Sequence, residues 1–403
     1  MSSSDWLIIG GGAAGLAAAR TAAARGRTVT LLEASAAAGK KILAAGGGRC
    51  NIGNLALTER GVDYGKFYGA AKNFVKPALS ALPSMREFFQ PLGATLIAHG
   101  QRLYPADERG ATILSALTGT PPFVHHPQIT AHFLCPIVAL RQDGDGWQAV
   151  AGDGRRFFAA RVLLATGGVN AATREILQAL GYAVTPLLPA LAPLTVAGFG
   201  DLAGVSVPQV EAWRVAASQS KIGRVAAPRR KFSGDLLFTH HGLSGPAILD
   251  LSGEVAAEVA AQGQSEIAIN LAPALTAAEF AAWRVGGQPL KNRLPLPERL
   301  AVKILRSVAL APQQRAAELT AAQSRSLWTA LTAHRFLLTQ LTPMNQAMVT
   351  RGGVALDEVE AKTLAGRRHK NLYFAGEILD VDGVSGGFNL QWAIAGGRLV
   401  ASV

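Results

Sequence analysis

The sequence has 403 residues, of which 49% are apolar and 16% are charged. This balance excludes a disordered chain and predicts a well-packed globular protein of two or three domains. The net charge of +12 favours polyanionic partners, although the same balance can serve solubility alone.

Cysteine content and the N-terminus indicate the compartment. Two cysteines, Cys50 and Cys135, are too few for a disulfide framework and favour a reducing environment. No basic segment precedes an apolar run at the N-terminus, and no uncharged apolar stretch is long enough to span a bilayer. We therefore expect a cytoplasmic protein with neither signal peptide nor membrane association.

A short apolar run followed by a glycine-rich turn opens the chain. Residues 6–9 are typical of a buried parallel strand, and Gly10, Gly12 and Gly15 follow with the spacing G-x-G-x-x-G. In dinucleotide-binding folds the first glycine permits the tight turn and the second lets the backbone approach a pyrophosphate. The third lets the next helix pack on the strand. The spacing predicts a nucleotide site.

The residues after this turn agree with that prediction. Alanine-rich residues 13–25 predict a helix, whose first N–H groups and positive dipole end favour phosphates. A second apolar run, 28–32, ends at Glu33, eighteen residues beyond Gly15. A carboxylate at the end of the second strand accepts ribose hydroxyls in such folds.

A lysine pair and a glycine triplet come next. Lys40 and Lys41 precede the triplet at 46–48, which is followed by Arg49 and Asn51. Glycine-rich backbone with three cations can wrap the phosphates and the redox ring of a cofactor. The alternative is a flexible loop.

The middle of the chain predicts further strands. Residues 101–105 predict a short extended piece that lines a pocket. Residues 137–141, 147–151 and 157–164 predict a three-stranded meander with glycine and aspartate turns. The last of these runs on into Ala-Thr-Gly-Gly at 165–168, where bare backbone can approach the cofactor.

The sequence texture changes at about residue 186. Prolines interrupt short β-like runs, which predicts a separate β domain over 189–272. It contains His240, which can form part of a substrate wall. No further ligands stand at metal-binding spacing, so we predict no metal site. Residues 273–335 are predicted to be mostly helical, with core residues at helical spacing.

The C-terminal stretch returns to nucleotide-fold patterns. Residues 371–377 predict a buried strand that ends in glycine and a carboxylate, and a glycine-rich loop then leads into an apolar helix. The start of this helix is a second place for oxygen-rich ligand atoms. We therefore predict an α/β protein with a discontinuous Rossmann-like FAD-binding domain around the two inserts. Residues 1–188 form its first part, and residues 336–403 return through the β insert to form its second part.

The pattern favours FAD over NAD as the tightly held dinucleotide. A simple NAD dehydrogenase needs no remote C-terminal return to complete its cofactor site. Only one G-x-G-x-x-G is present, so no separate NAD(P)H domain is predicted, and NAD(P)H would visit the flavin transiently. The absence of C-x-x-C excludes a redox disulfide of that type.

The assembled pattern resembles the BaiN/RdsA-type family of two-insert Rossmann flavoproteins, which is related to aminoacetone oxidase. The resemblance runs from Asp5 to Val403 and is carried by residues 10–15, 46–51, 238–246, 349–354 and 374–391. It implies non-covalent FAD, a discontinuous FAD domain, a small β-barrel insert and a helical insert.

The resemblance also implies a division of the cofactor site. The glycine turn and Glu33 would hold the ADP half, and Arg49, Asn51, Asp382 and residues 386–390 would lie near the ribityl chain and flavin. The predicted cofactor-binding residues are Gly10, Gly12, Ala13, Ala14, Gly15, Glu33, Lys40, Lys41, Gly47, Gly48, Arg49, Asn51, Ala165, Thr166, Gly167, Gly376, Glu377, Asp382, Gly386, Gly387, Phe388, Asn389 and Leu390.

Three functions stay open at this point. The first is a reductase that passes hydride from NAD(P)H through FAD to an electron-poor C=C bond, with a uridine of 23S ribosomal RNA as the most concrete substrate. The second is an oxidase or dehydrogenase of a small-molecule amine or ketone. The third is a non-catalytic FAD- or RNA-binding protein.

The reductase needs a proton donor, and two side chains are candidates. Cys50 stands in the predicted flavin loop, where the alternative is a small buried packing residue. His240 stands in the β insert, where the alternative is a hydrogen-bonded structural histidine.

Overall fold

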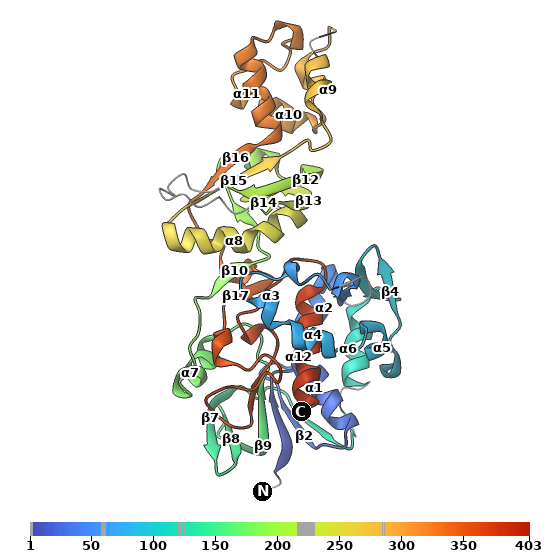
Figure 1. Cartoon of the computed structure of the whole chain (residues 1–403), viewed down its shortest axis with the longest axis vertical. Helices are drawn as coiled ribbons and strands as arrows, with labels where there is room; N and C mark the ends of the chain where they lie inside the picture. The colour runs from blue at the N-terminus through green and yellow to red at the C-terminus, as the bar shows by residue number, and fades with distance from the viewer. Residues whose placement is uncertain are drawn as a thin grey trace. The chain divides into compact units, whose positions relative to one another are not determined.

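The computed structural model describes residues 3–57, 62–119, 123, 126–215, 230–283, 285 and 287–403. The chain forms two compact units. Unit 1 combines Met1–Leu187 with Thr350–Val403, and unit 2 is Leu188–Val349. Figure 1 labels many of the elements of each unit.

The core of unit 1 is a seven-stranded sheet with the order β6-β2-β1-β9-β8-β7, in which β18 also pairs with β9. Strands β6, β2, β1, β9 and β18 run parallel to their neighbours, whereas β7 and β8 form an antiparallel meander with β9. The strands are β1 (Ser4–Ile9), β2 (Val29–Leu32), β6 (Ile129–His132), β7 (Ile137–Asp143), β8 (Gly146–Ala151), β9 (Arg156–Leu164) and β18 (Leu372–Phe374). The α/β Rossmann prediction is confirmed.

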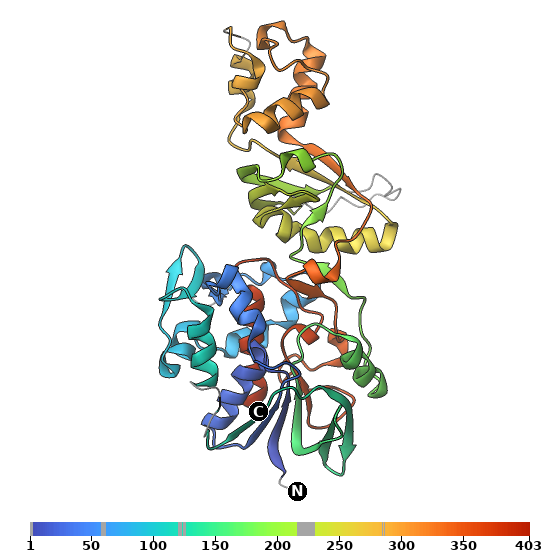
Figure 2. The ribbon, with the colours of Figure 1, turned by 180° about the vertical axis from the view of Figure 1, so that it is seen from behind.

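Helices α1 and α12 pack against each other through small residues, and Figures 1 and 2 show them side by side from opposite directions. A Cβ atom on Gly397 would lie 2.0 Å from the carbonyl oxygen of Ala14, and one on Gly376 would lie 3.1 Å from the Ala14 Cβ. The helices of unit 1 are α1 (Ala13–Ala24), α2 (Lys40–Ala44), α3 (Ala71–Phe74), α4 (Lys76–Ala81), α5 (Met85–Phe89), α6 (Gly110–Thr118), α7 (Ala171–Ala179) and α12 (Phe388–Ala401).

Unit 1 also contains a small antiparallel sheet of order β3-β5-β4, whose strands come between β2 and β6 in the sequence. Its first strand begins two residues after Asn51, the last residue of the predicted flavin loop. Its strands are β3 (Gly53–Asn54), β4 (Leu96–His99) and β5 (Arg102–Pro105).

Unit 2 contains a six-stranded antiparallel sheet with the order β11-β14-β13-β12-β15-β16. The predicted small β-barrel insert is not confirmed: this ladder has two ends, β11 and β16, within the part of the chain that the structure describes. Helix α8 (Pro246–Gln262) packs on the sheet. The strands are β11 (Leu194–Thr195), β12 (Ser206–Arg214), β13 (Phe232–Phe238), β14 (Gly242–Ser244), β15 (Ser265–Asn270) and β16 (His334–Leu338).

In the described residues between β15 and β16 the chain forms three α-helices, α9 (Ala277–Ala282), α10 (Glu298–Ser307) and α11 (Ala321–Thr332). Helix α10 buries Leu300, Ala301, Ile304 and Leu305, which recur at helical spacing. Where the chain passes between the units, β10 (Leu188–Ala190) pairs with β17 (Val349–Arg351). None of the helices in the described ranges is both long and apolar enough to cross a bilayer.

Candidate nucleotide-binding site

The three glycines of the first turn differ in what surrounds them. A Cβ atom on Gly10, whose φ is +112°, would lie 2.3 Å from the Ala165 carbonyl oxygen, and one on Gly15 would lie 1.9 Å from the Gly10 carbonyl oxygen. Both positions are therefore closed to larger side chains by the protein itself. A Cβ atom on Gly12 would have no protein atom within 4 Å, so the turn is open at Gly12. This opening fits a pyrophosphate that approaches the backbone.

The N-terminus of α1 is available to an anion. Gly12 caps the helix without a side-chain hydrogen bond, and the first turn holds no acidic residue. The first N–H groups, beginning at Ala13 and Ala14, have no intrahelical partners, and the helix dipole is positive at this end. The arrangement can bind phosphate oxygens.

Glu33 lies beside the glycine turn. Its Oε2 accepts a hydrogen bond from the N–H of Gly11 at 2.7 Å, and its Oε1 accepts one from the N–H of Ser35 at 2.7 Å. Each carboxylate oxygen can accept further bonds, so ribose hydroxyls can be bound without displacing these backbone donors. Glu33 therefore lies against the glycine turn, and its role toward a ribose stays a prediction.

Lys41 connects the N-terminal loop to the C-terminal segment. Its Nζ lies 2.5 and 2.7 Å from the two carboxylate oxygens of Glu377, and Glu377 Oε1 also accepts from the N–H of Thr350 at 2.8 Å. The Lys41 side chain is 58% exposed, and Lys40 is exposed beside it. The first and last parts of unit 1 thus meet at a charged pair.

The glycine triplet adopts a conformation that other residues rarely reach. Gly46, Gly47 and Gly48 have φ values of +59°, +68° and +93°, all in the left-handed region. Arg49 follows, and its guanidinium donates two hydrogen bonds of 2.7 Å to Glu108. This bond lowers the pKa of Glu108, and Arg49 is thus engaged within the protein.

The start of α12 is fixed to the small sheet. Asn54 donates from its backbone N–H to Gln391 Oε1 at 2.7 Å and from Nδ2 to the Gly386 carbonyl oxygen at 2.9 Å. In the amide orientation that satisfies both of its atoms, Asn51 donates to the Gly53 carbonyl oxygen at 3.0 Å and accepts from the Gly387 N–H at 3.2 Å. Two segments more than 300 residues apart in sequence are held together here.

Two buried polar atoms at this site have no protein partner in the described residues: Thr166 Oγ1 and Gln391 Nε2. Before Thr166, the N–H of Ala165 donates to the Ile9 carbonyl oxygen and so continues the pairing of β9 with β1. After it, a Cβ atom on Gly167 would have no protein atom within 4 Å. A buried polar group without a partner costs about 1–3 kcal/mol. These atoms therefore fit a bound group that supplies their hydrogen bonds.

Other predicted residues of the C-terminal loop bond within the protein. The Arg351 guanidinium pairs with the Asp382 carboxylate at 3.0 Å and stands 4.4 Å over the Tyr68 ring centroid. Burial raises the pKa of Asp382, and the charge of Arg351 opposes this shift. The Asn389 side chain bonds both backbone groups of Gly383, at 2.8 and 2.9 Å.

The remaining two predicted residues belong to the first turn of α12. Phe388 is buried edge-on against Phe67, and Leu390 is half-buried. The loop is therefore preformed by contacts within unit 1.

Comparison with known proteins decides the family. The sequence profile of the HI0933-like protein Rossmann domain matches residues 4–403. The chain belongs to this family of Rossmann flavoproteins.

Two curated relatives of this HI0933-like protein span most of its length. It is 30% identical over 374 residues to a protein of Clostridium scindens named 3-dehydro-bile acid delta(4,6)-reductase, covering 87% of this chain and 86% of the relative. It is 29% identical over 366 residues to a ribosomal RNA dihydrouridine synthase of Escherichia coli, and the match covers 86% of this chain and 84% of the relative. The relatives are thus similar over both units.

A solved structure shares the fold of the HI0933-like chain. The 3-ketosteroid delta1-dehydrogenase of Sterolibacterium denitrificans superposes with a TM-score of 0.51 and 12% identity, over 100% of this chain and 99% of that one. At this identity the likeness concerns the fold alone.

The two predicted proton donors of the HI0933-like protein have different surroundings. The Cys50 side chain is fully buried, and burial raises the pKa of its thiol to about 12. His240 is exposed. Cys50 lies in unit 1 and His240 in unit 2. Burial favours the packing alternative for Cys50, because a proton donor must reach the substrate.

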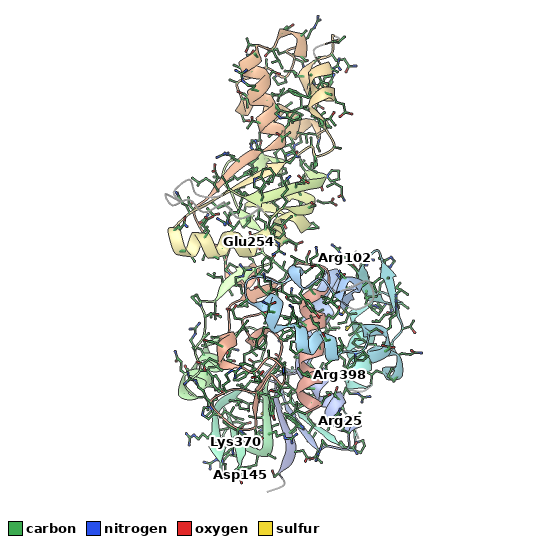
Figure 3. All side chains as sticks on the ribbon, in the orientation of Figure 1. Arg25, Arg102, Asp145, Glu254, Lys370 and Arg398 are labelled. Carbon is green, nitrogen blue, oxygen red and sulfur yellow. The ribbon has the colours of Figure 1, made fainter. Side chains whose placement is uncertain are left out.

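Sequence reasoning did not single out Asn54, Gln391 and Arg102 as site residues. The bonds of Asn54 and Gln391 are long-range, so neither pattern nor spacing signals them. Arg102, which Figure 3 labels, begins β5 and its Nε would lie 3.7 Å from a Cβ atom on Gly386. The only signal for Arg102 was its place in the extended piece 101–105.

Proposed function

We propose that this HI0933-like flavoprotein is an FAD-dependent reductase that hydrogenates an electron-poor C=C bond with NAD(P)H as electron donor. The observation that carries the proposal is the open glycine turn at Gly12, together with two buried polar atoms that have no protein partner in the described residues: Thr166 Oγ1 beside Gly10 and Gln391 Nε2 in α12. Two relatives carry names for reactions of this class, a delta(4,6)-reductase and a dihydrouridine synthase.

The chain's own residues would bind and orient the cofactor. The α1 N-terminus would bind the pyrophosphate and Glu33 the adenosine ribose, while Lys41 and Glu377 would contact the chain between phosphate and flavin. Thr166 would donate to a cofactor oxygen beside the glycine turn, and Gln391 would donate to flavin-side oxygen or nitrogen atoms. When bound, FAD supplies hydride transfer, for which no amino-acid side chain is suited.

The overall reaction needs one hydride and one proton. NAD(P)H is oxidised as its hydride is delivered to one carbon of the double bond, and an acid delivers the proton to the neighbouring carbon. Of the two predicted donors, Cys50 is the weaker, because its thiol is fully buried and its pKa is raised to about 12. His240 is exposed, so its imidazole is accessible.

We propose a uridine of ribosomal RNA as the substrate. The relative of Escherichia coli is named for this modification, and the net charge of +12 favours contacts with phosphates. A small amine or ketone, the alternative substrate class, would make no use of this charge.

The test begins with the purified protein. We expect a yellow protein that releases FAD on denaturation and whose flavin is bleached by NADPH or NADH without oxygen. Unmodified ribosomal RNA should then restore the oxidised spectrum, and nucleoside mass spectrometry should detect dihydrouridine. The oxidase alternative would be supported instead if an amino ketone reduces the flavin, oxygen rapidly reoxidises the reduced flavin, and RNA does not reoxidise it.

A genetic test is independent of the purified protein. Cells that lack the gene should lose one dihydrouridine from their ribosomal RNA, and a plasmid copy should restore it. An unchanged dihydrouridine content would contradict the proposed substrate while leaving the FAD proposal in place.

A further inference from the structure

The positive charge of the chain is unevenly distributed. Residues 273–335 contain nine Lys and Arg against three Asp and Glu, a net charge of +6, which is half of the total of +12. Residues 189–272 carry most of the sheet of unit 2. They contain six Lys and Arg against seven Asp and Glu, a net charge of −1. The helical segment between β15 and β16 is therefore the basic part of unit 2.

A hollow of about 470 Å³ lies in this basic part. It is bounded by the C-terminal end of α10, the second half of α11 and the start of β16. Among the residues that the structure describes, its polar lining consists of two guanidinium groups, one imidazole and three hydroxyls, with no carboxylate. These residues are Arg325, Arg335, His334, Ser307, Ser326 and Thr329.

Both arginines of this α10–α11–β16 hollow can reach a ligand. Arg325 is exposed and makes no ion pair with any residue that the structure describes. Arg335 pairs with Glu266 at 2.9 Å, but the two side chains are 61% and 36% exposed. An exposed pair of this kind contributes only about 0–1 kcal/mol, so Arg335 can exchange Glu266 for another anion at small cost.

The lining matches a phosphodiester. A guanidinium binds two phosphate oxygens with parallel hydrogen bonds, and hydroxyls donate to the same oxygens. Of the described residues that line the hollow, His334 alone has an aromatic ring, and this ring already contacts Phe199 and Phe336. Without a free ring on which bases stack, the hollow can bind a nucleic-acid backbone but has no platform for bases.

The helix ends distinguish a polymer from a lone phosphate. Helices α10 and α11 both end at the hollow, at Ser307 and Thr332, and the negative end of each dipole opposes a single anion there. A polynucleotide places several phosphates across the surface of the +6 segment and gains from each of them.

We propose that the α10–α11–β16 hollow is a binding surface for the phosphodiester backbone of RNA. It anchors the polymer on unit 2, independently of the sequence of the bound strand. The inference deepens the proposed function, on which it rests for the identity of the polymer.

The test compares two double variants of the FAD-loaded protein with equal loss of charge. Arg325→Gln/Arg335→Gln changes the hollow, and Arg141→Gln/Arg156→Gln changes two exposed arginines on β7 and β9 of unit 1. Binding of a labelled single-stranded RNA is measured by fluorescence anisotropy over a series of salt concentrations. Circular dichroism melting verifies that both variants are folded.

We expect weaker RNA binding only in the hollow variant. The slope of log affinity against log salt concentration should become shallower by about 1.4, because each phosphate contact on a single strand contributes about 0.7. Equal RNA binding by the two double variants would overturn the inference. So would displacement of the RNA by millimolar inorganic phosphate, since the hollow would then be a site for a lone anion.

RNA binding and the redox reaction are measured in separate assays. Flavin bleaching by NAD(P)H requires no RNA and should be unchanged in both variants. If the RNA binds through the hollow but is never reduced, the proposed reaction fails and the binding surface stands. If the RNA is reduced equally by both variants with unchanged affinity, the surface fails and the reaction stands.

Discussion

Gly387 and Gly53 approach each other so closely that a Cβ atom on Gly387 would lie 2.4 Å from the carbonyl oxygen of Gly53. Gly387 caps α12 with a φ of +95°, and Gly53 begins β3. The contact joins the C-terminal helix to the loop that follows the glycine triplet. Both strain and space therefore require glycine at 387.

Replacement of this glycine should disturb the cofactor site. We expect Gly387→Ala to lose most of its bound FAD and to lower the free energy of unfolding by about 1–3 kcal/mol, because the backbone must move. The flavin-to-protein ratio and the melting temperature measure both effects. Gly154→Ala is the matched control, since Gly154 also has a positive φ, +86°, but no atom within 4 Å of its Cβ position. Normal flavin content in Gly387→Ala would contradict a role for this contact.

Two other glycines separate ligand contact from folding. Gly12→Ala should leave the melting temperature of the apoprotein unchanged, because no protein atom lies within 4 Å and φ is −83°. Its FAD affinity should fall at least tenfold, since the methyl group takes the space of the pyrophosphate. Gly15→Ala should instead destabilise the fold, because its Cβ would lie 1.9 Å from the Gly10 carbonyl oxygen. Titration of both apoproteins with FAD distinguishes these outcomes.

Local features of the site were readable from the sequence. Strand, glycine spacing, helix and Glu33 depend on neighbouring residues, and the structure places Glu33 beside the turn that it was predicted to serve. The sequence did not predict which side chains pair with one another. Arg49 pairs with Glu108, and Asn54 bonds Gln391 across 337 positions, because these contacts depend on the closure of the whole unit.

The sheet of unit 2 shows the same limit. The alternation of apolar residues indicates which face of a strand is buried but not which strand lies next to it. The order β11-β14-β13-β12-β15-β16 brings β16 beside β15 across three helices, and in the described residues its ends stay apart. Short runs interrupted by proline predicted a separate β domain but contained no information on strand order, and the barrel was implied only by the family resemblance.

The Cys50 thiol should contribute to the pH dependence of stability. Its folded-state pKa of about 12 lies above the ordinary value of 9.0, so this contribution is complete below pH 9 and is lost as the pH rises toward 12. Cys50→Ala removes this loss. Denaturant unfolding of both proteins between pH 8 and about 10.5 should therefore show a steeper decline for the wild type. If Cys50 only packs, the variant should also retain NAD(P)H-dependent turnover.

The Arg351–Asp382 pair should be strongly coupled. The two side chains are 16% and 5% exposed, and removal of one partner leaves a buried charge at a cost of about 3–5 kcal/mol. Arg351→Met and Asp382→Asn should each lower the free energy of unfolding by more than half of the decrease in the double variant. A double-mutant cycle by denaturant unfolding measures the coupling energy. Additive effects would indicate that each residue acts through other contacts.

Arg102 should influence substrate binding rather than cofactor binding. Its side chain is exposed beside Gly386, and it makes no ion pair with the residues that the structure describes. If the flavin lies at the 386–390 segment, Arg102 can contact a phosphate of the RNA substrate. Arg102→Gln should then raise KM for RNA several-fold while FAD content and flavin reduction by NAD(P)H stay unchanged. Arg102→Lys should restore part of the affinity, because the charge returns without the planar fork. Arg141→Gln, with equal loss of charge, serves as the control, and an equal rise of KM in that variant would assign the effect to net charge alone.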